Sequence, residues 1–279
     1  MSAAAQRADR RPCGIVTLTT DFGYTDPYVG IMKGVMLSIA AEEFAGTRLE
    51  LVDLTHGIAA QSVDAAAFHL EHAWRRFPRG TVHLAVVDPG VGTDRGVLVC
   101  ALDGQLLIAP DNGLLSPILG AAGERAVCRE LDLERHRGPE LSRTFHGRDL
   151  FAPLAARLAC GLDLDAVGPR VTRWVALERP RPVPGADGEL AGCVQVVDGF
   201  GNLITNVAAA DLDGPLERWT CELGASRIPL AETYGEGPSG ALVALVDSFG
   251  YWEVAVCDGD AARRLAAGPG TPVVFRRKV

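Results

Sequence analysis

Four aspartates stand in or directly after short apolar segments in the first half of the sequence: Asp21, Asp53, Asp88 and Asp111. If these segments are parallel strands, their carboxyl ends meet at one edge of a sheet, where ligands of open α/β proteins bind. Carboxylates placed there can bind hydroxyls or cations and can orient a water. One such aspartate is ordinary turn chemistry, and this explanation stays open for Asp53 and for Asp111. Together, the four predict a ligand site.

Asp88 opens a rigid Asp-Pro-Gly turn, and Arg95 follows seven residues later. This spacing allows the turn to fold the arginine back onto the carboxylate, although a surface ion pair beside a turn gives the same pattern. His146 directly precedes a predicted helix. The backbone N–H groups at a helix N-terminus favour a neutral imidazole or a bound anion, so His146 is also a candidate.

Other motifs that carry chemistry are absent from the sequence. Residues 235–240 match Gly-x-Gly-x-x-Gly, but they contain a proline and open no helix, so the match does not indicate a dinucleotide site. No Walker lysine loop, Gly-x-Ser-x-Gly elbow or His-Glu-x-x-His helix occurs. His69 and His72 fall in a predicted amphipathic helix, where a packed or solvated histidine is the simpler interpretation.

The first 180 residues alternate between segments typical of strands and of helices. The strand candidates are apolar and rich in β-branched residues, as expected for strands buried on both faces: 14–20, 49–55, 81–87 and 96–102. The helix candidates have apolar residues at intervals of three and four or a matching length: 27–43, 61–77 and 147–161. This alternation predicts an α/β domain with a mostly parallel sheet.

The pattern changes after a segment rich in proline and glycine. We predict an α/β N-terminal domain over 13–178, a linker over 179–188 and a smaller all-β C-terminal domain over 189–279. The C-terminal part has no clear helix. Its strand candidates are separated by Gly, Pro and Asp: 191–198, 203–207, 218–223, 241–247, 251–256 and 271–277.

Composition limits the functional classes. The 279 residues carry a formal net charge of −8, which disfavours sequence-independent binding to nucleic acid. No apolar segment approaches the ~20 residues that span a bilayer, and no secretory signal is evident. The seven cysteines include no Cys-x-x-Cys pair, so we expect small core residues and neither disulfides nor a zinc site. These features predict a cytoplasmic protein.

Six motifs, taken together and in order, resemble the adenosine-forming S-adenosyl-L-methionine (SAM) hydrolases, or SAM hydroxide adenosyltransferases, which are relatives of the fluorinases and chlorinases. The resemblance extends from about residue 14 to about residue 275. The motifs are TTDFGYTDPYVGIMKG (19–34), VDLTH (52–56), VVDPGVGTDR (86–95), TFHGRDLFAP (144–153), DGFGNLITN (198–206) and DSFGYWEVAV (247–256).

This resemblance implies that water attacks C5′ of SAM to give adenosine and methionine, with no cofactor or metal. It places an Asp-Arg-His set that handles the water on Asp88, Arg95 and His146. It also implies a barrel-like C-terminal domain and a homotrimer with its sites between subunits. The halogenating relatives carry tyrosine, threonine and serine at the positions of Asp88, Val91 and Gly147, so halogenation is not expected here.

The resemblance also assigns binding roles. Asp21 takes the ribose hydroxyls, Asn202 reads adenine above the ring of Phe200, Asp198 pairs with the methionine ammonium, and Ser248 binds the carboxylate.

Glu253 and Val256 would lie where a strand closes over the ligand, Val256 through its backbone, and Asp26 and Tyr28 lie in a matching loop. The halogenases place arginine after the carboxylate-binding serine, whereas this chain has Phe249, so the carboxylate is expected to be held differently.

Two alternatives stay open. The aspartates at the strand ends could serve a metal-dependent phosphohydrolase, which chelators would inactivate. A non-catalytic protein that binds SAM or adenosine would bind these ligands without turnover.

Overall fold

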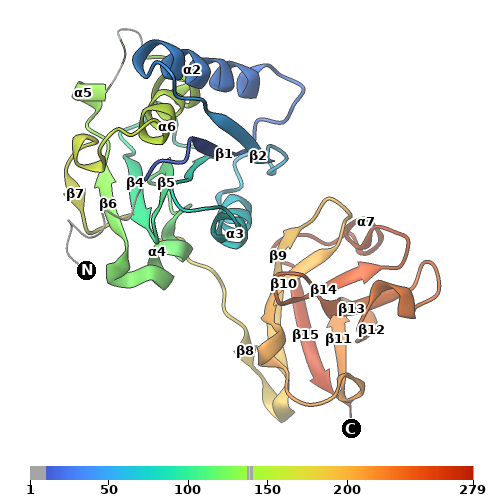
Figure 1. The fold of residues 1–279 in the computed structure, drawn as a ribbon. Helices are drawn as coiled ribbons and strands as arrows, with labels where there is room; N and C mark the ends of the chain where they lie inside the picture. The colour runs from blue at the N-terminus through green and yellow to red at the C-terminus, as the bar shows by residue number, and fades with distance from the viewer. Residues whose placement is uncertain (1–10, 137, 139–140, 279) are drawn as a thin grey trace. The chain divides into compact units, whose positions relative to one another are not determined.

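A computed structural model describes residues 11–136, 138 and 141–278 of the chain. The chain divides after Leu177 into two compact units, which are described separately (Figure 1). The first is an α/β unit with a largely parallel sheet, and the second is built on an antiparallel, nearly barrel-shaped sheet. This architecture confirms the predicted fold class. No helix within the described residues is long and apolar enough to cross a membrane.

The first unit is organised around one seven-stranded sheet in the order β2-β1-β3-β5-β4-β6-β7. The pairs β2–β1, β1–β3 and β3–β5 are parallel, whereas β4 runs antiparallel to both of its neighbours. The strands are β1 (Ile15–Thr20), β2 (Glu50–Thr55), β3 (Val82–Val86), β4 (Val97–Leu102), β5 (Gln105–Pro110), β6 (Val127–Glu130) and β7 (Arg170–Val171). Because β1 and β3 are adjacent and parallel, Asp21 and Asp88 follow strands that end at the same edge.

Helices cover both faces of this sheet (Figure 1). α2 and α6 pack against each other and form one core with β1 and β3, whereas α3 and α4 close the second core on the opposite face. β3 is completely buried, as its run of apolar residues predicts for a central strand. The helices are α2 (Tyr28–Glu43), α3 (Val63–Ala73), α4 (Ser116–Ala122), α5 (Leu133–His136) and α6 (Ala152–Ala159).

Two predicted helices have irregular ends. The helix expected over 61–77 begins at Val63 and passes into a 3₁₀ turn after Ala73. The helix expected over 147–161 opens with a π-helical turn, Gly147–Phe151, before α6 begins. Such turns are rare and often occur at functional sites.

The second unit is an antiparallel sheet in the order β12-β11-β15-β9-β10-β14-β13, with β8 added beside β9. A bridge between Leu230 and Ala244 joins the two edges of this sheet, so it is nearly a barrel around its own apolar core. The strands are β8 (Val183–Pro184), β9 (Leu190–Val197), β10 (Leu203–Ala208), β11 (Trp219–Leu223), β12 (Ser226–Pro229), β13 (Leu242–Val246), β14 (Tyr251–Val256) and β15 (Pro272–Arg277).

A short helix that the sequence did not lead us to expect lies in this unit. α7 (Ala261–Leu265) begins where the Asp260 side chain accepts a hydrogen bond from the Arg263 N–H at 2.7 Å. An aspartate in this position is a standard N-cap, so the signal was present, but five residues are too few to show a helical period.

The cysteines also correct an expectation. Cys100 on β4 and Cys128 on β6 face each other across adjacent strands, and the structure joins them as a disulfide. The sequence alone predicts seven unpaired core cysteines. A cross-strand pair 28 residues apart has no signature in linear spacing, because the strand register alone makes it a pair.

Candidate active site

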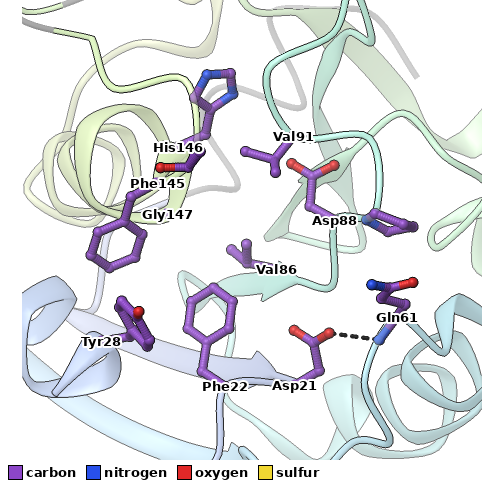
Figure 2. Close-up of a pocket in the computed structure, with 12 residues that line it drawn as sticks. Asp21, Phe22, Tyr28, Gln61, Val86, Asp88, Val91, Phe145, His146 and Gly147 are labelled. Atoms are coloured by element: carbon purple, nitrogen blue, oxygen red, sulfur yellow. Dashed lines mark hydrogen bonds between the residues drawn. The ribbon is translucent and has the colours of Figure 1, made fainter. Parts of the chain in front are cut away.

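A pocket of about 370 Å³ lies at the carboxyl ends of β1 and β3 (Figure 2). Four segments line it: the loop after β1 with the start of α2, Gln61 before α3, the turn after β3, and 144–147 before the π-helical turn. Asp21, Asp88, His146 and Tyr28, all candidates from the sequence, line this one cavity. The loops that carry them lie far apart in the sequence and are brought together by the order of the strands.

Asp88, Arg95 and His146 form a connected set. Arg95 Nε donates to both oxygens of Asp88, at 3.0 and 2.9 Å, and its Nη2 lies 2.5 Å from Oδ2. The same Nη2 lies 2.8 Å from His146 Nδ1. The side chains of Asp88 and Arg95 are only 5% and 9% exposed. The turn therefore does fold the arginine back onto the carboxylate, and the surface ion pair is ruled out.

The hydrogen bonds fix the state of His146. A guanidinium can only donate, so His146 Nδ1 accepts, and the neutral ring carries its proton on Nε2. Burial lowers the pKa of His146 below its ordinary value, and the positive charge of Arg95 lowers it further, against the opposing carboxylates of Asp88 and Asp149. His146 is therefore neutral at pH 7.

Glycine shapes the turn that carries this set. Gly92 has φ +80°, and a Cβ there would collide with the carbonyl oxygen of Arg143. The close approach of these two segments holds the Asp88 turn beside the loop that carries His146. Glycine is thus required both by its backbone conformation and by the contact.

The apolar wall of the pocket is an aromatic cluster. Phe22, Tyr28 and Phe145 pack edge to face, with ring centroids 5.1 to 6.1 Å apart (Figure 2). Gly147 lies against this cluster, and a Cβ at Gly147 would sit 3.1 Å from Met32 Sδ and 3.2 Å from Phe145. The pocket therefore has little room for a larger side chain at this position.

Asp21 is held by a residue that the sequence analysis missed. The backbone N–H of Gln61 donates to Asp21 Oδ2 at 2.8 Å, and Gln61 itself lines the pocket. Nothing in the residue type marks a glutamine before a helix as functional. Asp26 is exposed ahead of α2 and is not among the residues that line the cavity.

The other two aspartates at the strand ends have partners elsewhere. Asp53 binds Lys33 at 2.7 Å and lies 2.9 Å from His56, while Asp111 accepts the Val175 N–H at 2.8 Å. Within the described residues, no group of three or more His, Cys, Asp or Glu side chains is placed to hold a metal ion. Asp53 and Asp111 therefore do not join Asp21 and Asp88 in lining the pocket.

The second unit brings its own candidates together at the turn after β9. Asp198 Oδ1 accepts the N–H groups of Phe200 and Asn202, at 2.9 and 2.8 Å, and Oδ2 accepts from Asn202 Nδ2 at 3.1 Å. This turn buries Asn202 and leaves the Phe200 ring 80% exposed. An exposed phenylalanine beside a fixed amide is suited to binding a flat heterocycle.

A second acidic residue lies close to this turn. Glu253 on β14 is 2% exposed and accepts a hydrogen bond from the Tyr234 hydroxyl. Burial raises the pKa of Glu253 to about 7, and the negative charges of Asp198 and Asp247 add to the effect. Asp247 follows β13, which pairs with β14, and Tyr234 lies in a 3₁₀ turn before β13, so neither position in the sequence indicates a contact with Glu253.

Ser248 and Val256 differ in accessibility. Ser248 is exposed in the turn that Asp247 stabilises by accepting the N–H groups of Phe249 and Tyr251, at 2.8 and 2.9 Å. The Val256 side chain belongs to the core of the barrel, and its carbonyl accepts the Gly259 N–H at 3.0 Å.

The sequence of the chain is similar to those of known proteins over both units. Residues 16–168 match the SAM hydroxide adenosyltransferase N-terminal domain, and residues 192–274 match the C-terminal domain. The chain is 39% identical to the (R)-S-adenosyl-L-methionine hydrolase of Thermus thermophilus, over 92% of this chain and 98% of that protein. It is 40% identical to the enzyme of the same name from Salinispora tropica, over 93% and 96%. A fluorinase from Nocardia brasiliensis is 30% identical, over 88% and 90%.

The fold is similar to that of a solved structure as well. An uncharacterized conserved protein from Thermotoga maritima superposes with a TM-score of 0.82 at 34% identity, covering 94% of this chain and all of that one. With both domains matched in order and close relatives along almost the whole length, the chain belongs to the SAM hydroxide adenosyltransferase family.

Proposed function

We propose that this protein hydrolyses SAM to adenosine and L-methionine. The observation that carries the proposal is the connected set of Asp88, Arg95 and His146, of which Asp88 and His146 line a pocket that Asp21 also lines. The names of the two (R)-S-adenosyl-L-methionine hydrolases compared above support the same reaction and favour the (R) epimer at sulfur as the substrate. A protein that only binds SAM has no use for a water-handling set of this kind.

The chemistry is a displacement at carbon. The oxygen of a water attacks C5′ as the C5′–S bond breaks, and the bonding pair leaves with sulfur as the neutral thioether of methionine. The leaving group needs no general acid. The site must hold the water in line with the breaking bond and take up its proton, and such positioning can lower a barrier by up to ~7–11 kcal/mol.

The hydrogen bonds favour Asp88 as the proton acceptor. His146 Nδ1 is occupied by Arg95, and Nε2 carries the ring proton, so the neutral imidazole has no free lone pair for the water. Asp88 keeps lone pairs beyond those that Arg95 uses. We therefore assign orientation of Arg95 and of the water to His146, and proton uptake to Asp88.

The substrate-binding roles are divided between the two units. We propose that Asp21 binds the ribose hydroxyls and that Tyr28 contributes to the apolar wall. In the second unit, Asn202 would read adenine above Phe200. Its Nδ2 donates one hydrogen bond to Asp198, which leaves its oxygen and its second N–H for the base.

The methionine end of SAM carries an ammonium and a carboxylate. We propose that Asp198 and Glu253 attract the ammonium and that the exposed Ser248 binds the carboxylate. Asp26 stays a weaker candidate because of its exposed position, and a contribution of Val256 would have to come from its backbone.

We further propose a homotrimer with sites between subunits, a reaction without metal or halide, and a cytoplasmic location. The trimer is supported by the family resemblance, and the absence of halogenation by the carboxylate of Asp88 and the crowded Gly147. An anionic carboxylate repels a halide, and no serine fits at Gly147 without movement of Met32 or Phe145.

The test is to incubate the chelator-treated protein with each SAM epimer and to quantify adenosine and methionine, with chloride and fluoride in parallel samples. Equimolar products from the (R) epimer, independent of halide, are expected. Intact SAM that binds tightly would instead identify a binding protein. Activity that returns only with Mg²⁺ or Mn²⁺ would favour the phosphohydrolase.

A further inference from the structure

Gln61 has a backbone conformation that glutamine rarely adopts, with φ +65°. It is the third residue of a turn closed by a hydrogen bond of 2.9 Å from the Ser62 N–H to the Ala59 carbonyl. A positive φ at the third position is typical of type II turns, where glycine is the favoured residue. The chain thus holds a strained glutamine where glycine would fit freely.

Three other non-glycine residues within the described part of the chain have positive φ: Asp103, Asp258 and Ala266. Each has an ordinary explanation. Asp103 and Asp258 precede glycines in tight turns, where aspartate is tolerated, and Ala266 ends helix α7. Gln61 differs because it lines the catalytic pocket.

The backbone at Gln61 closes a connection between two loops. We call residues 20–24 and 56–61 the paired loops. They are joined by the Gln61 N–H to Asp21 Oδ2 at 2.8 Å and by the Gly23 N–H to the His56 carbonyl at 2.8 Å. The buried ring of His56 also lies 2.7 Å from Thr20 Oγ1.

A glycine at position 61 would keep these backbone contacts without the strain, so the contacts alone do not explain a glutamine. Strain that persists in a binding pocket points to a functional side chain. Figure 2 shows Gln61 on the wall of the pocket that also carries Asp21 and Asp88. Its amide offers both a donor and an acceptor to a ligand.

We propose that the side-chain amide of Gln61 binds the substrate, at the ribose 3′-hydroxyl. This inference rests on the proposed function, in which Asp21 takes the ribose hydroxyls and Asp88 directs water to C5′. Of the two ribose hydroxyls, the 3′-hydroxyl is nearer to C5′ along the sugar ring. A side chain on the pocket wall that also carries Asp21 and Asp88 should therefore contact the 3′-hydroxyl rather than the 2′-hydroxyl. A hydroxyl donates and accepts, which matches an amide.

The test compares the dissociation constants of adenosine and 3′-deoxyadenosine by calorimetry for the wild type, Gln61→Gly and Ala266→Gly. Gln61→Gly should reduce the preference for adenosine by about tenfold, the value of one good hydrogen bond, with an unchanged or higher Tm. Ala266→Gly relieves the same kind of strain away from the pocket and should keep the wild-type preference. Gln61→Asn, which tolerates positive φ but has a shorter side chain, should also lose the preference.

An unchanged preference in Gln61→Gly, or in Gln61→Asn if the glycine variant does not fold, overturns the proposal. The wild type separates this failure from that of the proposed function. A wild type that hydrolyses SAM while the variants keep its preference removes only the role of Gln61. A wild type that binds neither nucleoside and leaves SAM intact removes the proposed function itself.

Discussion

The two units hold their carboxylates in opposite electrostatic environments. In the first unit, Asp88 is buried together with Arg95, which binds both of its oxygens. In the second unit, Asp198, Asp247 and Glu253 lie near one another, and none of them has a lysine or arginine within ion-pair distance among the residues that the structure describes. Burial, with the added effect of these neighbouring charges, raises the pKa of Glu253 to about 7.

This difference matches the two tasks in the proposed reaction. A carboxylate that handles water must stay ionised whether or not substrate is present, so the protein supplies its cation. Carboxylates that attract a cationic ligand must have no cationic partner until the ligand binds. In the free protein, these carboxylates therefore repel one another. In the proposed reaction, the first arrangement would serve turnover and the second would serve substrate affinity.

The largest expected effect comes from removing one charge in each unit. Asp88→Asn should lower kcat by ~10³-fold, within the range for lost acid–base catalysis, and change the SAM dissociation constant little. Asp198→Asn should instead weaken SAM binding by ~10-fold or more, the value of a charged hydrogen bond. Stopped-time product assays and calorimetry measure the two quantities.

Asp94→Asn, in the same turn as Asp88 but exposed, is the matched control and should behave as the wild type. If Asp88→Asn affected binding alone, Asp88 would belong with the carboxylates of the second unit and the comparison would not hold.

Arg95→Met makes the first unit resemble the second, because it leaves a buried carboxylate without its cation. We expect kcat to fall by ~10²-fold, as for other lost electrostatic contacts in active sites. The pKa of His146 should rise, since the positive charge of Arg95 lowers it in the wild type. NMR titration of the imidazole measures this shift.

Arg125→Met is a suitable control because Arg125 pairs with Asp103 at the surface. Arg125→Met should change neither kcat nor the pKa of His146. An unchanged His146 titration in Arg95→Met would contradict the contact between the two side chains.

The next effect is a pH dependence of SAM binding. Because Glu253 has a pKa of about 7, it is mostly protonated at pH 5.5 and half ionised at pH 7, and only the ionised form attracts the ammonium. The SAM dissociation constant should therefore decrease by about tenfold over this range, as expected for binding linked to loss of one proton. Glu253→Gln should remove the dependence.

Glu253 also affects the free energy of unfolding, but with a pH dependence opposite to that of SAM affinity. The folded state holds a proton that the unfolded state releases above about pH 4.5, so this contribution to the free energy of unfolding is lost as the pH rises towards 7.

A constant SAM affinity between pH 5.5 and 7 in the wild type would show that Glu253 does not contact the ammonium.

The smallest effect concerns Phe200. Since its ring is 80% exposed in the free protein, Phe200→Leu should leave the Tm unchanged. Affinity for adenosine should fall by ~2- to 10-fold, the value of an aromatic contact. A lower Tm without a change in affinity would assign Phe200 to the fold of the second unit.

The sequence predicted the elements that repeat a clear pattern. The strands that became β1 to β4 were predicted because strands buried on both faces appear as short apolar runs rich in β-branched residues, and α2 was predicted from the helical length and spacing of 27–43. Asp88, Arg95 and His146 were singled out because a rigid turn and a helix start mark their positions, and the structure brings the three side chains into contact. β5 was missed because Gln105–Pro110 follows β4 after a two-residue turn and merges with it in the sequence.

The remaining features depend on register and on backbone conformation. Asp247 comes near Glu253 through the pairing of β13 with β14, Tyr234 reaches it from a separate 3₁₀ turn, and the Cys100–Cys128 disulfide depends on the alignment of β4 with β6. Gln61 was missed because a positive φ is a property of the folded turn. Glutamine gives no sign of it, whereas glycine would have.

The paired loops set a rule for exchanging parts between relatives. A chimaera that takes 20–24 from one protein and 56–61 from another would bring an Asp21 whose donor on Gln61 comes from a different parent. The buried contact between Thr20 and His56 would be split in the same way. The eleven residues of the paired loops are separated in the sequence by a helix and a strand, but they form one structural unit. A chimaera should therefore take both loops from the same parent.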